Sequence, residues 1–334
     1  MTEQTSNLGS WRNARWVAAR LAAIFALLLV LASGVYGLEI IFQSRVTAVG
    51  ASITMLFILP FCLGAIATFL VDPKGMKADP GYFIIPPLLV ASVFIVGALF
   101  FREGLVCVAA LAPLWLVSAL VGSVTVGLLR ERFKQRNTIN CGVLIVLPFA
   151  ALLGEGGVSR ETAVFTVARS IEIAARPEEI WPHLLKMDDI SRREGRWNIT
   201  QDLLGVPRPA SAVVEVGADG PVRKARWGKT ISFEEHIFAM QDRRELRWRF
   251  AFPNDSIRRH TDRHIAPDGE NLKITEGGYD LRALTPEVTK LTLTTTYAVT
   301  TPVNHYGSVW GELLLGDIQS NILQIVKDRS EAGA

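Results

Sequence analysis

Two acidic side chains and a phenol in the C-terminal half of the chain could transfer protons. Glu235 shares a strand face with Phe233 and Ile237, so its carboxylate could point into an apolar interior. Burial there would raise its pKa and suit it to acid–base chemistry. A register shifted by one residue, or a position at the mouth of the interior, would instead leave Glu235 at the surface. Asp280 and Tyr297 are similar candidates.

A second group of titratable residues occupies alternate positions of a predicted strand. His260, Asp262 and His264 would share one face, about 6.7 Å apart stepwise. This spacing fits a metal site, or an acid–base cluster in which His264 takes part. Neighbouring arginines, and the lack of an evident fourth ligand, favour a solvated hairpin. The sequence therefore predicts no metal site and no cofactor, and the glycine pair 277–278 indicates a strand bulge rather than a phosphate loop.

Aromatic residues could line a hydrophobic binding site. The candidates are Trp248, Phe250, Tyr279, Tyr297 and Trp310. A cavity lining and a packed core give the same pattern in sequence, so both interpretations stay open.

These side chains require an antiparallel sheet and helices to position them. Residues 165–174 alternate as a strand, Pro177 opens a helix, and a short second helix is expected within residues 188–195. Turn residues separate the further predicted strands at 212–216, 222–227, 231–240, 245–250, 258–265, 271–283 and 289–299. A long amphipathic helix over residues 304–330 closes the chain.

This order of elements resembles the START-like superfamily, which includes polyketide cyclase and dehydrase-like proteins and lipid-transfer START domains. The opening segment SIEIAARPEEIWPHLLKMDDIS and the closing segment GSVWGELLLGDIQSNILQIVKDR carry the resemblance, over about residues 163–330. It implies a helix-grip fold, in which a curved antiparallel sheet grips the long C-terminal helix. It also implies an apolar cavity between them for a lipid, polyketide or other hydrophobic molecule. Fold alone does not establish function.

The N-terminal half contains five long runs without a charged side chain, at 21–38, 46–71, 81–101, 104–129 and 138–154. Four have the roughly 18 residues that cross a bilayer as a helix, and the shorter fifth could instead be re-entrant or interfacial. We therefore expect a membrane domain over residues 1–154, a linker over 155–162 and a START-like domain over 163–330. Ser118 with Gly122, and Ser123 with Gly127, predict close helix packing.

Positive charges predict the orientation of these spans. With a cytoplasmic N-terminus, nine Lys and Arg lie in inside segments and two lie outside. We expect a multi-pass protein of the cell membrane, whose C-terminal domain is extracytoplasmic if there are five spans. The domain is cytoplasmic if the fifth does not cross.

Charge and cysteine content narrow the possible functions. Residues 155–334 carry 24 Lys and Arg against 26 Asp and Glu, which argues against a nucleic-acid partner. All three cysteines lie in the predicted spans, so we expect no disulfide in the C-terminal domain. The uncharged spans argue against a transporter, because ion pathways need charged groups between helices.

Three functions remain open at this point. The first is binding of a lipid or other hydrophobic small molecule beside the bilayer, where such a ligand concentrates. The second is a cyclase or dehydratase-type enzyme on a membrane-partitioned substrate, with Glu235, His264, Asp280 or Tyr297 exchanging protons. The third is a docking or assembly module with a filled interior. The sequence does not determine the oligomeric state.

Overall fold

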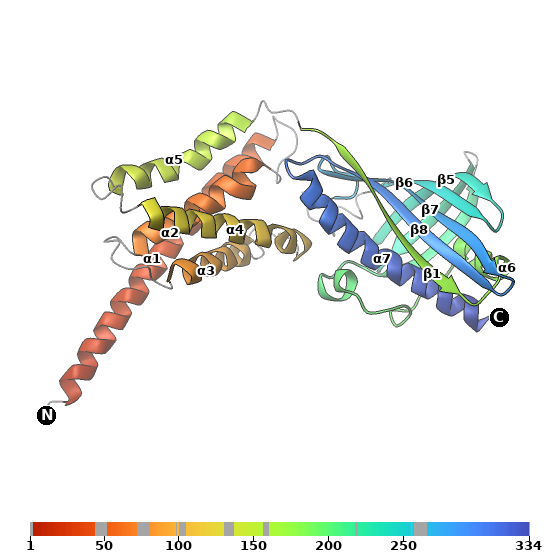
Figure 1. Cartoon of the computed structure of the whole chain (residues 1–334), viewed down its shortest axis with the longest axis horizontal. Coiled ribbons are helices and arrows are strands. Elements are labelled where there is room, and N and C mark those ends of the chain that lie inside the picture. Colours follow the sequence, from red (N-terminus) through yellow and green to blue (C-terminus); the bar gives the residue numbers. More distant parts are fainter. Residues whose placement is uncertain are drawn as a thin grey trace. The chain divides into compact units, whose positions relative to one another are not determined.

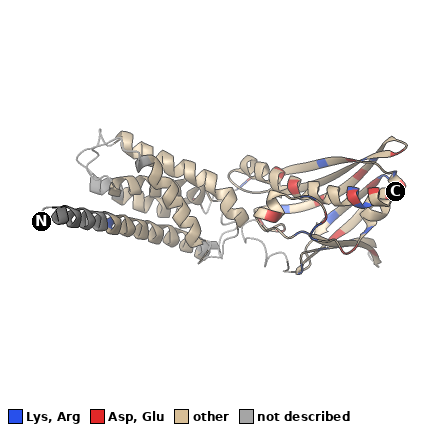
Figure 2. Ribbon diagram, turned by 90° about the horizontal axis from the view of Figure 1, so that it is seen from below, with Lys and Arg blue, Asp and Glu red and all other residues tan. Residues whose placement is uncertain are grey.

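The chain forms two compact units, Met1–Ser159 and Arg160–Ala334. The computed structural model describes residues 3–43, 52–71, 81–97, 99, 105–129, 137–155, 160–217, 220–254, 256 and 266–333. Charged residues are sparse on the helices of the first unit, whereas both signs of charge are frequent on the second (Figure 2). This distribution follows the composition shift seen in the sequence.

The first unit consists of helices (Figure 1). They are α1 Glu3–Gln43, the π-helical segment η1 Thr54–Ile58, α2 Leu59–Val71, α3 Gly81–Val96, α4 Leu105–Leu129 and α5 Asn137–Glu155. By length and composition, three stretches could cross a membrane: Ala18–Leu38, Thr54–Val71 and Leu105–Leu129. Phe83–Val96 and Gly142–Glu155 are apolar but shorter. Within the described residues, the five predicted runs are therefore helical, but three of them have the length of a span.

Helices α2 and α4 pack with their backbones in direct contact. Gly64 lies against the backbone of Ala119, and Gly122 lies against the backbone of Phe61. A Cβ atom at either glycine would overlap main-chain atoms of the other helix. The close packing predicted at Gly122 is therefore confirmed as a contact within the chain.

The end of α5 is tied to the start of the α2 region. The Glu155 carboxylate accepts hydrogen bonds from the Thr54 backbone nitrogen at 2.6 Å and from the Thr54 hydroxyl at 2.7 Å. An acidic side chain at a helix N-terminus also interacts favourably with the helix dipole. Glu155 thus belongs to the helical unit, although the sequence suggests that the linker begins there.

The second unit is an eight-stranded sheet with a long helix across it (Figure 1). Its elements are β1 Ala163–Ile173, α6 Pro177–Leu185, β2 Lys186–Met187, η3 Ile199–Leu203, β3 Pro209–Gly217, β4 Gly220–Trp227, β5 Ile231–Gln241, β6 Glu245–Ala251, β7 Leu272–Thr285, β8 Val288–Val299 and α7 Asn304–Ala332. The strand order is β1-β8-β7-β6-β5-β4-β3-β2, and all neighbours are antiparallel. Helix α7 packs against β1 and β8. This is the helix-grip arrangement of an antiparallel sheet around a long C-terminal helix, so the expected fold of this unit is confirmed.

The inward face of the sheet packs its hydrophobic side chains against α7. Every second residue of β8 from Leu291 to Val299 is buried, as the alternation predicts. Leu246 and Trp248 on β6 are buried in the same way. Leu246, Trp248, Leu291 and Leu293 cluster with Leu323, Ile325 and Val326 of α7. Tyr297 and Val299 form a second cluster, against which Leu315 of α7 packs. The predicted strand at 258–265 lies outside the described residues.

The segment between α6 and β3 differs from the prediction. The second helix expected within residues 188–195 is wrong, because that stretch follows β2 as irregular chain and turns, with Gly195 at a φ of 77°. The helical turn occurs later, as η3. It begins there because the Asn198 side chain caps it, accepting a hydrogen bond from the Gln201 backbone nitrogen at 2.8 Å.

Candidate functional site

A buried ion pair lies on the inward face of the sheet. Arg223 on β4 and Glu235 on β5 stand opposite each other in the strand register. Arg223 Nη1 donates a hydrogen bond to Glu235 Oε2 at 2.5 Å, and both side chains are only 6% exposed. Charged side chains are almost never buried to this extent unless they are paired. The pair is therefore a charged centre beside the apolar core of the unit.

Two aromatic residues enclose the guanidinium group of Arg223. Its Cζ atom lies 5.7 Å from the ring centroid of Trp248 on β6 and 5.7 Å from that of Tyr279 on β7. The two rings are 5.3 Å apart. A cation over aromatic faces is favourable, and more so when water is excluded. The four neighbouring strands β4 to β7 thus each contribute one residue to this cluster.

Gly277 makes room for the indole of Trp248. The two residues are paired across β6 and β7, and a Cβ atom on Gly277 would lie 2.7 Å from the indole Nε1 and Cε2 atoms. The bulge predicted at the glycine pair is wrong, because the register shifts earlier, between Ile274 and Glu276. Gly277 and Gly278 pair regularly with β8. At Gly277, the missing side chain serves packing rather than strand geometry.

Two N–H donors of the cluster lack a hydrogen-bond acceptor. Arg223 Nε and Trp248 Nε1 are both buried and have no partner among the described residues. A buried donor left without an acceptor costs about 1–3 kcal/mol. Such groups are rare in native folds and require an explanation. An oxygen atom of a bound molecule could satisfy either donor.

Burial and ion pairing act in opposite directions on the two charged residues. Burial raises the pKa of Glu235 and the Arg223 charge lowers it, and burial prevails, so the pKa lies above its ordinary value. Burial lowers the pKa of Arg223, but Glu235 and Tyr279 together raise it further. Arg223 therefore stays protonated, and Glu235 is the group of the pair that can exchange a proton. Burial also raises the pKa of Tyr279.

The raised pKa of Glu235 predicts how stability depends on pH. Above the unfolded value of about 4.3, and up to the higher folded value, the folded state binds more protons at this site than the unfolded state. The contribution of Glu235 to the free energy of unfolding should therefore fall as pH rises through this window. We expect Glu235→Gln to remove that slope. Hydrogen–deuterium exchange of the β5 amides in the full chain, corrected for intrinsic rates, would measure it.

A surface carboxylate provides the control for this measurement. Glu270 is exposed, so Glu270→Gln should leave the slope as in the unsubstituted chain. An unchanged slope in Glu235→Gln would contradict the raised pKa.

The structure brings several of the sequence-predicted residues together. Glu235, Trp248 and Tyr279 belong to the cluster around Arg223. Phe250 lies beside it, with its ring centroid 6.1 Å from that of Trp248. The alternative that a shifted register places Glu235 at the surface is wrong. The Glu235 side chain is 6% exposed, and it lies on the inward face opposite Arg223.

The other candidates lie elsewhere. Asp280 is only half buried and accepts hydrogen bonds from Arg247 Nη2 at 2.9 Å, in an ion pair away from the inward cluster. The Tyr297 hydroxyl donates to the Ser308 carbonyl at 3.3 Å and so joins β8 to the first turns of α7. Trp310 is half buried on α7. The candidate His264 and its neighbours at 260 and 262 lie outside the described residues.

Arg223 is the residue that sequence analysis missed. A strand with three basic residues in five positions looks solvated, and Arg223 does not stand out in it. A usable signal was nevertheless present. The short turn between β4 and β5 pairs Trp227 with Ile231, and counting back along both strands places Arg223 opposite Glu235.

Comparisons with known proteins give the following results. No protein-family model matches the chain, and no curated protein matches it. Similar solved structures include a START superfamily protein from Mycobacterium smegmatis, at 15% identity and a TM-score of 0.32, over 51% of this chain and 99% of that one. The Zhui aromatase/cyclase from Streptomyces sp. R1128 is 14% identical with a TM-score of 0.31, over 51% and 94%. A norcoclaurine synthase point mutant from Thalictrum flavum is 13% identical with a TM-score of 0.29, over 50% and 97%.

Proposed function

We propose that the second unit binds a hydrophobic small molecule that carries an oxygen acceptor, such as a carboxylate, phosphate or polar carbonyl group. The observation that carries this proposal is the pair of buried donors, Arg223 Nε and Trp248 Nε1, without a partner among the described residues. They lie among apolar and aromatic side chains of the core. A ligand would place its oxygen on these donors and its apolar part against the core, the usual division of roles in a small-molecule site.

We also propose that the apolar helices of the first unit hold the second unit at a membrane. The three stretches long and apolar enough to span a bilayer support it. A poorly soluble ligand concentrates in a bilayer, so a domain held there would meet it at a high effective concentration. The charge bias of the loops favours a cytoplasmic N-terminus. The domain would then be extracytoplasmic with five crossings and cytoplasmic with four.

Ligand recovery from the natively extracted full chain tests the binding site. The double variant Arg223→Met with Glu235→Leu removes the charged centre without leaving an unpaired charge. We expect the unsubstituted chain to retain a hydrophobic, oxygen-bearing compound, detected by mass spectrometry after purification in polymer-bounded bilayer discs. The double variant should retain at least about tenfold less of it, equivalent to a loss of about 1.4 kcal/mol.

The sheet offers a matched control for that variant. Arg247→Met with Asp280→Leu removes a more exposed ion pair from the same sheet and should leave ligand recovery unchanged. Equal recovery from the unsubstituted chain and from both double variants would show that any compound is bound elsewhere. That result would contradict the proposed site.

A cyclase or dehydratase-type activity is the second candidate, and the environment of Glu235 favours it. A buried carboxyl group with a raised pKa can hold a proton and donate it to a substrate, and the Tyr279 phenol lies in the same cluster. In that case Glu235→Gln should retain the compound but not convert it. Mass spectrometry of that compound, before and after incubation with the unsubstituted chain, distinguishes a mass loss of one water from simple binding.

A further inference from the structure

The segment between α6 and β3 exposes large apolar side chains. Trp197, Ile199 and Leu203 are 66%, 41% and 62% exposed. All three lie within seven consecutive residues, in or just before η3. Single exposed apolar residues are common, but a group of large ones marks an interaction surface.

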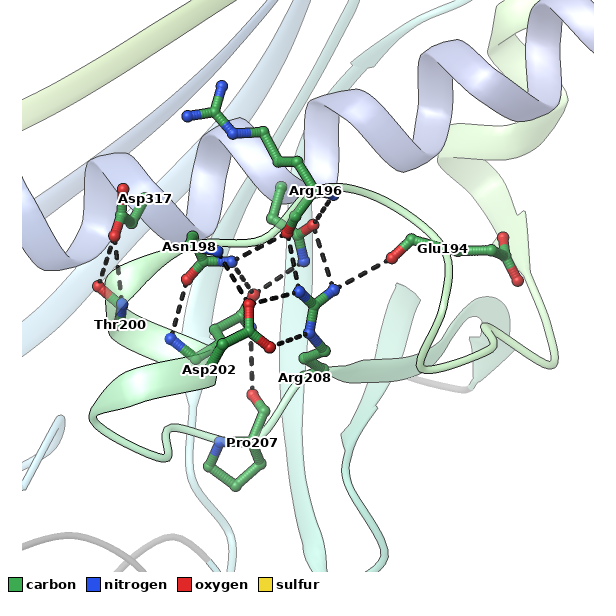
Figure 3. A network of polar contacts seen from close by, with 10 residues as sticks. Glu194, Arg196, Asn198, Thr200, Asp202, Pro207, Arg208 and Asp317 are labelled. Carbon is green, nitrogen blue, oxygen red and sulfur yellow. Dashed lines mark hydrogen bonds and ion pairs between the residues drawn. The ribbon is translucent and has the colours of Figure 1, made fainter.

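A buried polar network holds this segment against α7 (Figure 3). The Gln201 Oε1 atom accepts hydrogen bonds from Asn198 at 3.1 Å and from Asn321 of α7 at 2.8 Å. Asp317 of α7 accepts two more at 3.2 Å, from the backbone nitrogen and the hydroxyl of Thr200. Four of these five residues are buried: Asn198, Thr200, Gln201 and Asn321.

Arg208 closes the network from the β3 side (Figure 3). It donates to Asp202 at 2.8 Å and to the backbone carbonyls of Glu194 at 3.1 Å and Arg196 at 2.8 Å. The segment therefore buries polar side chains and exposes apolar ones, the reverse of an ordinary solvated loop. Its hydrogen bonds fix the direction in which the exposed side chains point.

Basic side chains accompany the apolar surface. Arg192, Arg193 and Arg196 are exposed on the same segment, and within the described parts of the chain their side chains form no ion pair. In Figure 3 the guanidinium of Arg196 points away from the network. Tryptophan is enriched where membranes meet water, and a basic residue near an anionic bilayer contributes about 1 kcal/mol of attraction. This combination fits a lipid surface better than an apolar protein partner.

An apolar stripe on α7 extends this surface toward the start of the helix. Val309 and Leu313 are exposed, and they precede Asp317 at intervals of four residues, so they share its side of the helix. The first residue of α7, Asn304, donates a hydrogen bond to the Glu161 carbonyl at 2.8 Å. Glu161 lies just before β1, the first strand of this unit. The stripe therefore leads to the end of the unit at which β1 begins.

We propose that residues 191–203, with Val309 and Leu313, form a surface that docks into the interface of an anionic bilayer. Trp197 and Leu203 would reach the boundary of the acyl chains, and the three arginines would contact the lipid headgroups. This goes beyond ligand binding and rests on the proposed insertion of the apolar helices into the same bilayer.

Quenching by brominated lipids in vesicles that contain the full chain tests this proposal. The fluorescence of Trp197 is the difference between the unsubstituted chain and Trp197→Phe. In brominated phosphatidylcholine with phosphatidylglycerol we expect this difference signal to fall at least about twofold, because the indole would sit at the depth of interfacial tryptophans. Trp227→Phe is the matched control, since Trp227 is half buried against Phe233, and its difference signal should not be quenched.

Further outcomes separate a membrane from other partners. Replacing Arg192, Arg193 and Arg196 by Gln should weaken the quenching of Trp197 only when phosphatidylglycerol is present. Quenching of Trp197 by aqueous iodide would overturn the proposal. Shielding of Trp197 from both iodide and the brominated lipid would also overturn it, because that result would indicate a protein partner. A chain that does not float with the vesicles would also overturn it. In the double variant Arg223→Met with Glu235→Leu, brominated lipid should quench Trp197 as strongly as in the unsubstituted chain. This test is therefore independent of ligand binding.

Discussion

Replacement of Arg223 by methionine should lower the free energy of unfolding of the second unit by about 3–5 kcal/mol. The loss arises because Glu235 would remain buried without its positive partner. The loss should grow as pH rises, because a carboxyl group with a raised pKa is neutralised as pH falls and then needs no positive partner. Hydrogen–deuterium exchange of the sheet amides in the full chain would measure it.

The double variant separates stability from ligand binding. With Glu235→Leu added to Arg223→Met, no charge is left unpaired, and we expect stability to return to within about 1 kcal/mol of the unsubstituted chain, or above it. The double variant should nevertheless retain at least about tenfold less ligand than the unsubstituted chain. A double variant as unstable as the single one would contradict this account of the pair, and one that kept its ligand would contradict the binding role of Arg223.

Replacement of Gly122 by leucine should unfold the helical packing of the first unit, at a cost of about 3 kcal/mol or more. The new side chain would meet the backbone of Phe61, and main-chain atoms of a packed helix cannot move aside as a flexible side chain can. Resistance of the chain to unfolding by sodium dodecyl sulfate in mixed micelles would show the loss.

The same helical unit contains a glycine for comparison. Gly142 on α5 has no atom within 4 Å of the position that a Cβ would take, so Gly142→Leu should be tolerated. Similar losses for both substitutions would point to a general intolerance of bulk and not to the contact between α2 and α4.

Local patterns in the sequence determined the order of elements and the inward face of several strands. The alternation on β6 and β8 requires only that side chains point to opposite faces in turn, and this is a property of each strand by itself. It places Leu246 and Trp248 on one face of β6 and Tyr297 on one face of β8, and all three are buried. The apolar runs of the N-terminal half were equally readable, since helix length and composition are local quantities.

Only the tertiary structure decided which of those residues meet. Arg223 has no distinguishing feature in its own strand, and its role depends on the residue opposite it on β5. The helical turn at 199–203 gains its partners Asp317 and Asn321 from α7, more than 100 positions away. Sequence periodicity gives the direction of a side chain, whereas strand register and long-range packing set its partner. For a buried charge or a polar network, that partner determines both the energy and the chemistry.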